Sequence, residues 1–152
     1  MNVKIERAAV SDAEEILLLQ RLAYQSEAKL YNDYRIEPLV QTLEQLQKQF
    51  QDHTILKALA GNAIVGSVRA NYLGGTCSIG KLMVDPTYQN QGIGKLLMHA
   101  IEGVYPKSRY ELFTGSRSER NISFYGKLGY KVFSERAMAP DFSLLFLEKI
   151  GL

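Results

Sequence analysis

The sequence contains a single cysteine, Cys77, and no tryptophan among its 152 residues. One cysteine cannot form an internal disulfide, and the simplest role for Cys77 is that of a small buried hydrophobic residue. The two histidines, His53 and His99, lie far apart in the sequence, and no group of Cys and His has metal-ligand spacing. The sequence therefore predicts neither a disulfide framework nor a metal centre.

The sequence also lacks a long apolar run and an excess of one charge. No stretch approaches the roughly 18 apolar residues of a membrane-spanning helix, and "MNVKIERAAV" lacks the apolar core of a signal peptide. The net charge of +2 is far from the broad basic field of a nucleic-acid-binding domain, although "GSRSER" brings Arg117 and Arg120 together. We therefore expect a cytoplasmic protein without a membrane or nucleic-acid partner.

Periodic apolar positions predict the helices. A first helix follows Ser11, which forms a capping box with Glu14, and it frays before Pro38, which disfavours helix at the preceding residue. Further helices are predicted at 39–50, 93–104 and 118–130.

Alternating and β-branched stretches between turn residues predict the strands. These cover residues 3–9, 54–60, 63–72, 77–84, 110–115, 130–139 and 141–149. The last strand is apolar on both faces, so it is either a central strand or an edge that pairs with a second subunit in a homodimer. The order β-α-α-β-β-β-α-β-α-β-β predicts one α/β domain, residues 1–152, around a mixed sheet.

A glycine-containing loop, "QNQGIGK" at residues 89–95, lies between a strand and a strongly periodic helix. The first N–H groups of such a helix have no partner within it, so they can bind a phosphate, which the helix dipole favours. Gly92 and Gly94 keep side chains away from that phosphate, and Lys95 adds positive charge. The loop is expected to bind a pyrophosphate, although a structural turn before a helix is the simpler alternative for this pattern alone.

Two common phosphate loops do not fit this stretch. A P-loop requires Ser or Thr after its Gly-Lys pair, where this sequence has Leu96. A dinucleotide-binding loop requires a small residue where this sequence has Leu97.

Two motifs together resemble one family. "LMVDPTYQNQGIGKLLMHAI" resembles the signature of the GNAT superfamily of N-acetyltransferases through Gln89, Gly92 and Gly94. "NISFYGKLGYKVF" resembles the second motif of that family, in which a tyrosine, here Tyr125, precedes a glycine and an aromatic residue. The resemblance implies a single GNAT-like α/β domain with a mixed, mostly antiparallel sheet and helices on both faces.

The resemblance also implies a co-substrate, acetyl-coenzyme A, and an acetyl transfer to an amine without a metal. Ser118 stands where the family often has an asparagine, so Asn121 is a substitute candidate, unless Ser118 simply caps its helix. The residues that the resemblance assigns to the coenzyme are Met83, Val84, Gln89, Asn90, Gln91, Gly92, Ile93, Gly94, Lys95, Asn121 and Phe124.

The resemblance gives Tyr125 the role of the general acid that protonates the departing thiolate. A lysine-like amine of pKa about 10.4 must lose a proton before it attacks. The family often uses a glutamate in the strand before the loop, but "CSIGKLMV" has no carboxylate. Glu111 is the first candidate base, Glu27 and Asp33 are others, and a water chain or the deprotonated fraction of the substrate is the alternative.

The segment "YQSEAKLYNDYRIEP", residues 24–38, mixes tyrosines and carboxylates that suit a cationic amine. We take Glu27, Tyr31 and Asp33 as acceptor-binding candidates and expect a small-molecule primary amine, with a polyamine-like acceptor as one example. A solvated loop with core tyrosines explains the pattern equally well. A protein N-terminus or lysine as acceptor, a different acyl group and a non-catalytic acyl-coenzyme A sensor are the alternatives.

Overall fold

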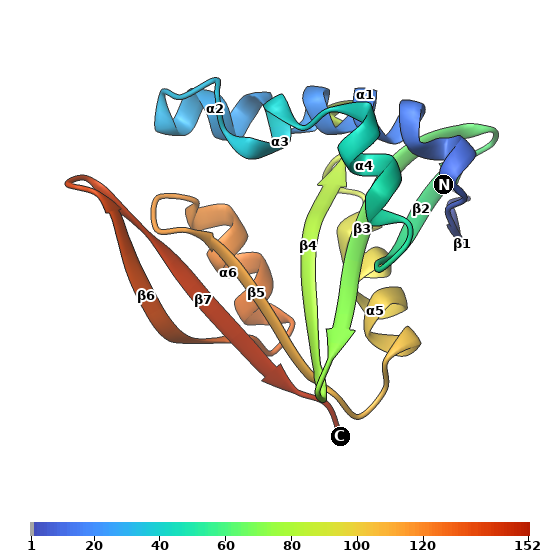
Figure 1. The fold of residues 1–152 in the computed structure, drawn as a ribbon. Helices are drawn as coiled ribbons and strands as arrows, with labels where there is room; N and C mark the ends of the chain where they lie inside the picture. Colours follow the sequence, from blue (N-terminus) through green and yellow to red (C-terminus); the bar gives the residue numbers. More distant parts are fainter. Residues whose placement is uncertain (1) are drawn as a thin grey trace.

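The computed structural model describes residues 2–152, which form one seven-stranded sheet in the order β1-β2-β3-β4-β5-β7-β6 (Figure 1). Neighbouring strands are antiparallel except for β4 and β5, which are parallel. The strands are β1 (Lys4–Arg7), β2 (Thr54–Ala60), β3 (Ala63–Leu73), β4 (Thr76–Val84), β5 (Arg109–Gly115), β6 (Lys131–Ala139) and β7 (Phe142–Ile150). The predicted α/β fold with a mixed, mostly antiparallel sheet is confirmed.

Helices cover both faces of the sheet, as expected. They are α1 (Ala13–Ala23), α2 (Gln25–Tyr31), α3 (Glu37–Val40), α4 (Leu43–Gln49), α5 (Ile93–Val104) and α6 (Glu119–Lys127), with 3-10 turns η1 (Val10–Asp12) and η2 (Pro86–Tyr88). The apolar sides of α1 and α4 pack with Ile55 and Ile64 on one face. The apolar side of α5 packs with Leu56 and Val68 on the other, and Cys77 is fully buried there, as the sequence predicts.

The N-terminal helices differ from the prediction in where they begin and end. Ser11 lies inside η1, and the carboxylate of Asp12 instead accepts the Ala9 N–H at 2.9 Å. The predicted helix 39–50 is two helices, because Thr42 has extended backbone and caps α4 by accepting the Gln45 N–H at 3.2 Å. Pro38 lies in the first turn of α3, where its missing N–H has no consequence.

The strand at Phe142–Ile150 is internal, since β7 pairs with β5 on one side and with β6 on the other. The edge strands of the sheet are therefore β1 and β6. Gly74 and Gly75, with φ of 58° and 84°, form the β3–β4 turn, which agrees with the primed turn type that the sequence predicts.

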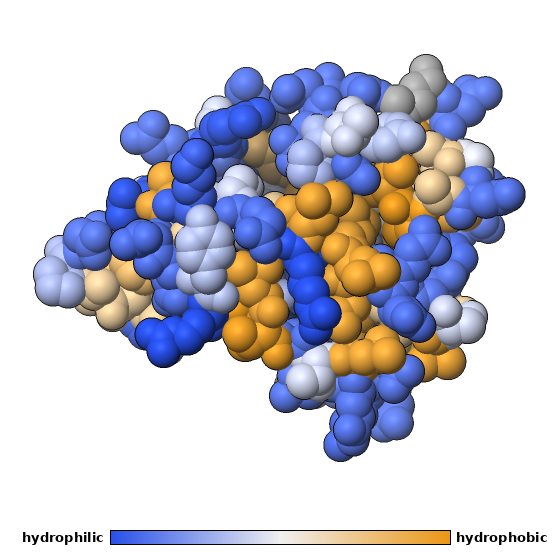
Figure 2. Space-filling view, turned by 90° about the horizontal axis from the view of Figure 1, so that it is seen from above, coloured by the Kyte–Doolittle hydropathy of each residue, from blue (hydrophilic) through white to orange (hydrophobic). Residues whose placement is uncertain are grey.

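The outer side of the helical segment from η1 to α3 carries exposed apolar residues. Figure 2 looks onto this side and shows hydrophobic side chains gathered between polar ones. The exposed large residues of this segment include Val10, Leu18, Leu22, Leu30 and Val40. Among residues 2–152, no helix is long and apolar enough to cross a membrane.

Replacing Leu97 with alanine should lower the free energy of unfolding by about 2–5 kcal/mol, because the side chain is fully buried between α5 and the sheet. Urea denaturation measures the change. Leu96→Ala is the matched control, since Leu96 is 47% exposed on the same helix and should change stability by about 0.5 kcal/mol or less. Equal losses in the two variants would contradict the assigned face of α5.

Candidate active site

Strands β4 and β5 pair over a short stretch and then separate. Their register runs from Thr76 opposite Arg109 to Ser78 opposite Glu111 and goes no further. Beyond that point β5 stays paired with β7, whereas β4 stays paired with β3, so the two halves of the sheet diverge (Figure 1). The edge of β4 that faces β5 therefore carries backbone groups without a strand partner from Gly80 onward.

A β-bulge lies at the same place in β4. Ser67 pairs with Met83 and Arg69 pairs with Gly80, so one residue of β3 faces two residues of β4, Lys81 and Leu82. Lys81 has a φ of 54°, an uncommon conformation for a residue with a side chain. The bulge bends β4 where it leaves β5. Sequence reasoning missed it, although an isolated glycine inside a strand, here Gly80, is a signal for a bulge.

The glycine loop leads into the N-terminus of α5. Gly92 is the N-cap residue, with a φ of 83°, and no side chain caps the helix. Within residues 2–152, the N–H groups of Ile93, Gly94 and Lys95 have no hydrogen-bond partner, and Leu96 is the first residue of α5 whose N–H is bonded back, to the Gly92 carbonyl. Unpartnered N–H groups and the helix dipole make this end of α5 favourable for an anion.

The other predicted loop residues surround this helix end. Gln89, Asn90, Gln91 and Lys95 are exposed. The Gln89 side-chain amide donates to the Val84 carbonyl at 3.4 Å, and the Asn90 side-chain oxygen accepts from Arg120 of α6 at 3.3 Å.

Gly94 also has a packing role that the sequence did not indicate. A Cβ at this position would lie 3.3 Å from the Phe124 ring and 4.0 Å from Leu82. Gly94 therefore allows α6 to pack closely against the first turn of α5, and its expected role beside a phosphate stays a prediction. At Gly92 a Cβ would meet nothing within 4 Å, so that glycine is required by its positive φ.

Tyr125 lies on α6 within an aromatic group. Its ring centroid is 5.3 Å from that of Phe124 and 5.9 Å from that of Tyr130, and it packs against the α5 side of the core. Burial and the charge of Glu27 raise the pKa of the Tyr125 phenol. Burial and the neighbouring Tyr125 likewise raise the pKa of Tyr24, which ends α1. The structure thus places two protonated phenols near each other, and the sequence did not single out Tyr24.

Two of the three acceptor candidates connect α2 to the start of α6. The Glu27 carboxylate accepts from Ser118 at 3.0 Å and from Asn121 at 3.2 Å. Ser118 Oγ also lies 2.7 Å from the Tyr31 hydroxyl, so the Ser118 side chain binds α2 and does not cap its own helix. Asn121 also donates to Thr114 at 3.4 Å, which occupies the amide that was a candidate for the coenzyme.

Tyr31 fits closely against the other half of the sheet. Its ring lies over Gly115, where any Cβ would overlap the hydroxyl, and its centroid is 4.9 Å from that of Phe142. Asp33, by contrast, is exposed and accepts the Arg35 N–H at 2.9 Å in a local turn. The structure therefore does not gather Glu27, Tyr31 and Asp33 into one acceptor wall.

A cleft of about 340 Å³ opens where β4 and β5 diverge, on the face covered by α4. Glu111 lines it, and its carboxylate accepts from Arg109 at 2.9 Å. Lys81 lines it as well and forms an ion pair with Glu37 at 2.7 Å. The side chain of Met83 is buried on this same face of the sheet, among residues of α1 and α4.

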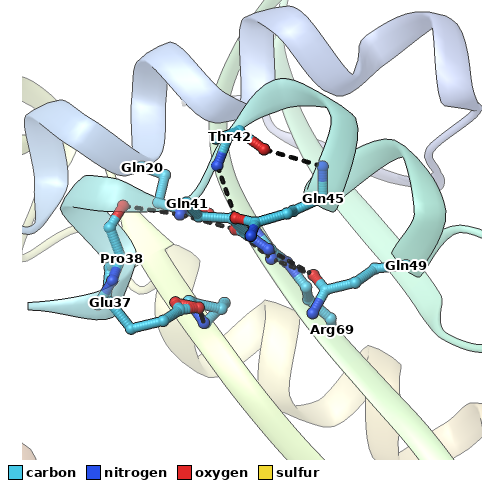
Figure 3. Close-up of polar contacts among 9 residues, drawn as sticks. Gln20, Glu37, Pro38, Gln41, Thr42, Gln45, Gln49 and Arg69 are labelled. Carbon is cyan, nitrogen blue, oxygen red and sulfur yellow. Dashed lines mark hydrogen bonds and ion pairs between the residues drawn. The ribbon is translucent and has the colours of Figure 1, made fainter.

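A buried arginine that sequence reasoning missed forms part of this cleft. Arg69 of β3 is 2% exposed, and Figure 3 shows Gln20 of α1, Gln41 of the link between α3 and α4, and Gln49 of α4 converging on it. Arg69 donates to Gln49 at 2.7 Å, to Gln41 at 3.2 Å and, over a short contact, to Gln20. The signal in the sequence was a lone charge in the otherwise apolar stretch "AIVGSVRANY".

No group of three or more His, Cys, Asp and Glu side chains with metal-binding geometry is found within residues 2–152.

Comparisons with known proteins agree with this geometry. Residues 18–130 match the model of the acetyltransferase (GNAT) family. A Bacillus subtilis (strain 168) protein described as "Putative acetyltransferase BSU40680" is 26% identical over 88 residues, which cover 58% of this chain and 60% of that protein.

Solved structures share the fold over nearly the whole chain. The PaiA N-acetyltransferase of Thermoplasma acidophilum in complex with coenzyme A has a TM-score of 0.81 at 20% identity, with 99% of each chain covered. The protein smu.2055 of Streptococcus mutans UA159 has a TM-score of 0.82 at 17% identity, covering 97% of this chain and 98% of that one. With the family match spanning the glycine loop and Tyr125, the chain belongs to the acetyltransferase (GNAT) family.

Proposed function

We propose that the protein transfers an acetyl group from acetyl-coenzyme A to a primary amine of a small-molecule acceptor, by direct attack within a ternary complex. The observation that carries this proposal is one arrangement of three features. The N–H groups of the first turn of α5 are free, the edge of β4 has no strand partner beyond its last pair with β5, and Tyr125 lies on α6 beside Phe124, the ring that packs against Gly94 of α5.

The residues present suit the coenzyme. The N–H groups of Ile93, Gly94 and Lys95 would hold its pyrophosphate. The open edge of β4 around Met83 and Val84 would offer backbone groups to the amide-containing arm. An open hollow of about 390 Å³ on α6 is lined by Arg120 and Lys127 among others, whose positive charges suit the phosphorylated adenosine end.

Tyr125 is proposed as the general acid. Bound acetyl-coenzyme A supplies an activated thioester, and the thiolate that departs needs a proton. The raised pKa of Tyr125 keeps its phenol protonated at neutral pH, so the proton is in place before attack. Tyr24, held protonated beside it, keeps a second hydroxyl in the same region.

Glu111 is proposed as the base that takes the amine proton, directly or through a water. It lines the cleft, and its side chain is positioned by the ion pair with Arg109 at 2.9 Å. Glu27 accepts two hydrogen bonds from α6, and Asp33 caps an exposed turn, so neither is as well placed.

The test of the function is the release of free thiol from acetyl-coenzyme A in the presence of a panel of amines, with mass spectrometry of the product. Formation of an N-acetylated small amine supports the proposal. If only peptide N-termini or protein lysines are acetylated, the acceptor is a protein and not a small molecule. Coenzyme binding without any turnover would indicate a sensor.

Gly92→Val should weaken coenzyme A binding by about 10-fold or more, because a β-branched residue is strained at a φ of 83° and would displace the N-terminus of α5. Isothermal titration calorimetry measures the dissociation constant. Gly103→Ala on the same helix is the control, since a Cβ there meets nothing within 4 Å and φ is not positive. Unchanged affinity in Gly92→Val would argue against binding at this helix end.

Tyr125→Phe should lower kcat by about 10²- to 10⁴-fold and leave coenzyme A affinity within a few-fold, because only the proton donor is removed. Steady-state kinetics and calorimetry measure the two quantities. Tyr34→Phe, at a tyrosine that is 55% exposed, should retain wild-type kcat. A Tyr125→Phe variant with full kcat would exclude the general-acid role.

The plot of kcat/KM against pH should show no decrease below about pH 10. A general acid acts in its protonated form, and a pKa raised above the ordinary value of about 10 keeps Tyr125 in that form as pH increases. The rate should therefore rise with pH as the acceptor amine loses its proton, and then level off. A fall in kcat/KM centred below pH 9 that disappears in Tyr125→Phe would show that the phenol pKa is not raised.

A further inference from the structure

The guanidinium of Arg69 is a buried charge without a carboxylate partner. Its hydrogen-bond acceptors are the side-chain oxygens of Gln20, Gln41 and Gln49, all of them neutral. None of the ion pairs found within residues 2–152 includes Arg69. A buried cation ordinarily requires a compensating anion, because water no longer solvates it.

Arg69 also has hydrogen-bonding capacity to spare. Three of its five N–H donors are used, two from Nη1 and one from Nη2. The Nε–H is buried and has no partner among the described residues. Two unused donors on one guanidinium match the two oxygens of a carboxylate, which accepts parallel N–H bonds from arginine.

The glutamines hold this side chain rigidly beside the cleft. Gln41 also accepts from Gln20 at 3.0 Å and donates to Gln49 at 3.1 Å, and Gln20 donates to the Pro38 carbonyl at 2.8 Å (Figure 3). Each amide is thus oriented by a neighbour, with its oxygen toward the arginine. Such a network fixes the guanidinium without neutralising it.

The rest of the lining favours an anion over a polycation. Gln49, His53 and Asn71 offer hydrogen-bond donors, Lys81 is already paired with Glu37, and Glu111 is the one carboxylate among the described lining residues. Burial lowers the pKa of Arg69 to about 10, so the group remains charged at neutral pH. The carboxylates of Glu27 and Asp33 are engaged in other contacts, and Glu37 is neutralised by Lys81, which disfavours a polyamine-like acceptor.

We propose that the acceptor carries a carboxylate in addition to its amine, and that Arg69 binds this carboxylate while the amine lies toward Glu111. This inference rests on the proposed acetyl transfer. Arg69 pairs with Gly80, and Glu111 pairs with Ser78, so β4 separates the two charged residues by two strand spacings, about 10 Å. One charge of each sign on opposite sides of a cleft suits an amino-acid-like zwitterion.

The experiment compares α-, β- and γ-amino acids with their own carboxamides as acceptors. These pairs differ in the carboxylate while the carbon chain that carries the amine is the same. At least one amino acid should be acetylated with a kcat/KM roughly 10- to 100-fold above that of its carboxamide. The difference should come from a lower KM for the amino acid and not from kcat. Equal values, or a preference for the carboxamide in every pair, would overturn the proposal.

Gln49→Glu tests the role of Arg69 without removing the arginine. A carboxylate at this position would pair with the guanidinium internally, because Gln49 Oε1 already lies 2.7 Å from Arg69 Nη1. The preference for the amino acid over its carboxamide should fall about 10-fold or more. The KM for acetyl-coenzyme A should stay the same, and the melting temperature should stay the same or rise. A folded Gln49→Glu protein with an unchanged preference would contradict the proposal.

Gln45→Glu is the matched control. Gln45 is exposed one turn earlier on α4, and its side chain accepts the Thr42 N–H at 2.9 Å, a contact that a glutamate retains. It adds the same charge to the same helix without touching Arg69. The preference for the amino acid should therefore stay at the wild-type value.

Failure of this inference differs from failure of the proposed function. Turnover of uncharged amines but not of amino acids leaves acetyl transfer in place and overturns the carboxylate site. If no amine turns over, the thermal shift of the coenzyme A-loaded protein decides. Stabilisation by an amino acid but not by its carboxamide, lost in Gln49→Glu, supports the carboxylate site, and no stabilisation overturns it.

Discussion

The divergence of β4 from β5 is the constraint on which the rest of the structure depends. A parallel ladder that stops at Ser78 and Glu111 leaves the edge of β4 with unpaired backbone groups inside the fold. The bulge at Lys81 and the pairing of β5 with β7 hold β4 and β5 apart, so the backbone groups of one strand cannot form hydrogen bonds with those of the other. A ligand with its own hydrogen-bonding groups is the natural partner for such an edge.

The two faces of this opening are chemically different. On one face α5 and α6 supply unpartnered N–H groups, positive side chains and a protonated phenol, which suit an anionic acyl carrier. On the other face α4 and the strands form a cleft with Arg69 and Glu111. In the proposed mechanism, the two substrates would approach from opposite sides and meet between the strands.

Contacts across the opening fix its geometry. Tyr31 and Glu27 of α2 reach the start of α6 through Ser118, and Gly115 leaves the space that the tyrosine hydroxyl needs. These contacts are largely polar and partly buried, so they connect the two halves through hydrogen bonds and not through the apolar core. The segment that the sequence presents as an acceptor wall thus also connects the two halves of the sheet.

The sequence by itself determined the elements, the glycine loop and Tyr125, because those features depend on local periodicity, on the φ angle that Gly92 permits and on two family motifs. It could not give the packing of Gly94 against a ring of another helix, or the split of the helix at Thr42. Only the tertiary structure decided which carboxylates are already engaged and that three glutamines surround Arg69. The reason is physical: a side chain's charge and hydrogen bonds are set by partners distant in sequence, whereas backbone conformation is largely set by neighbours.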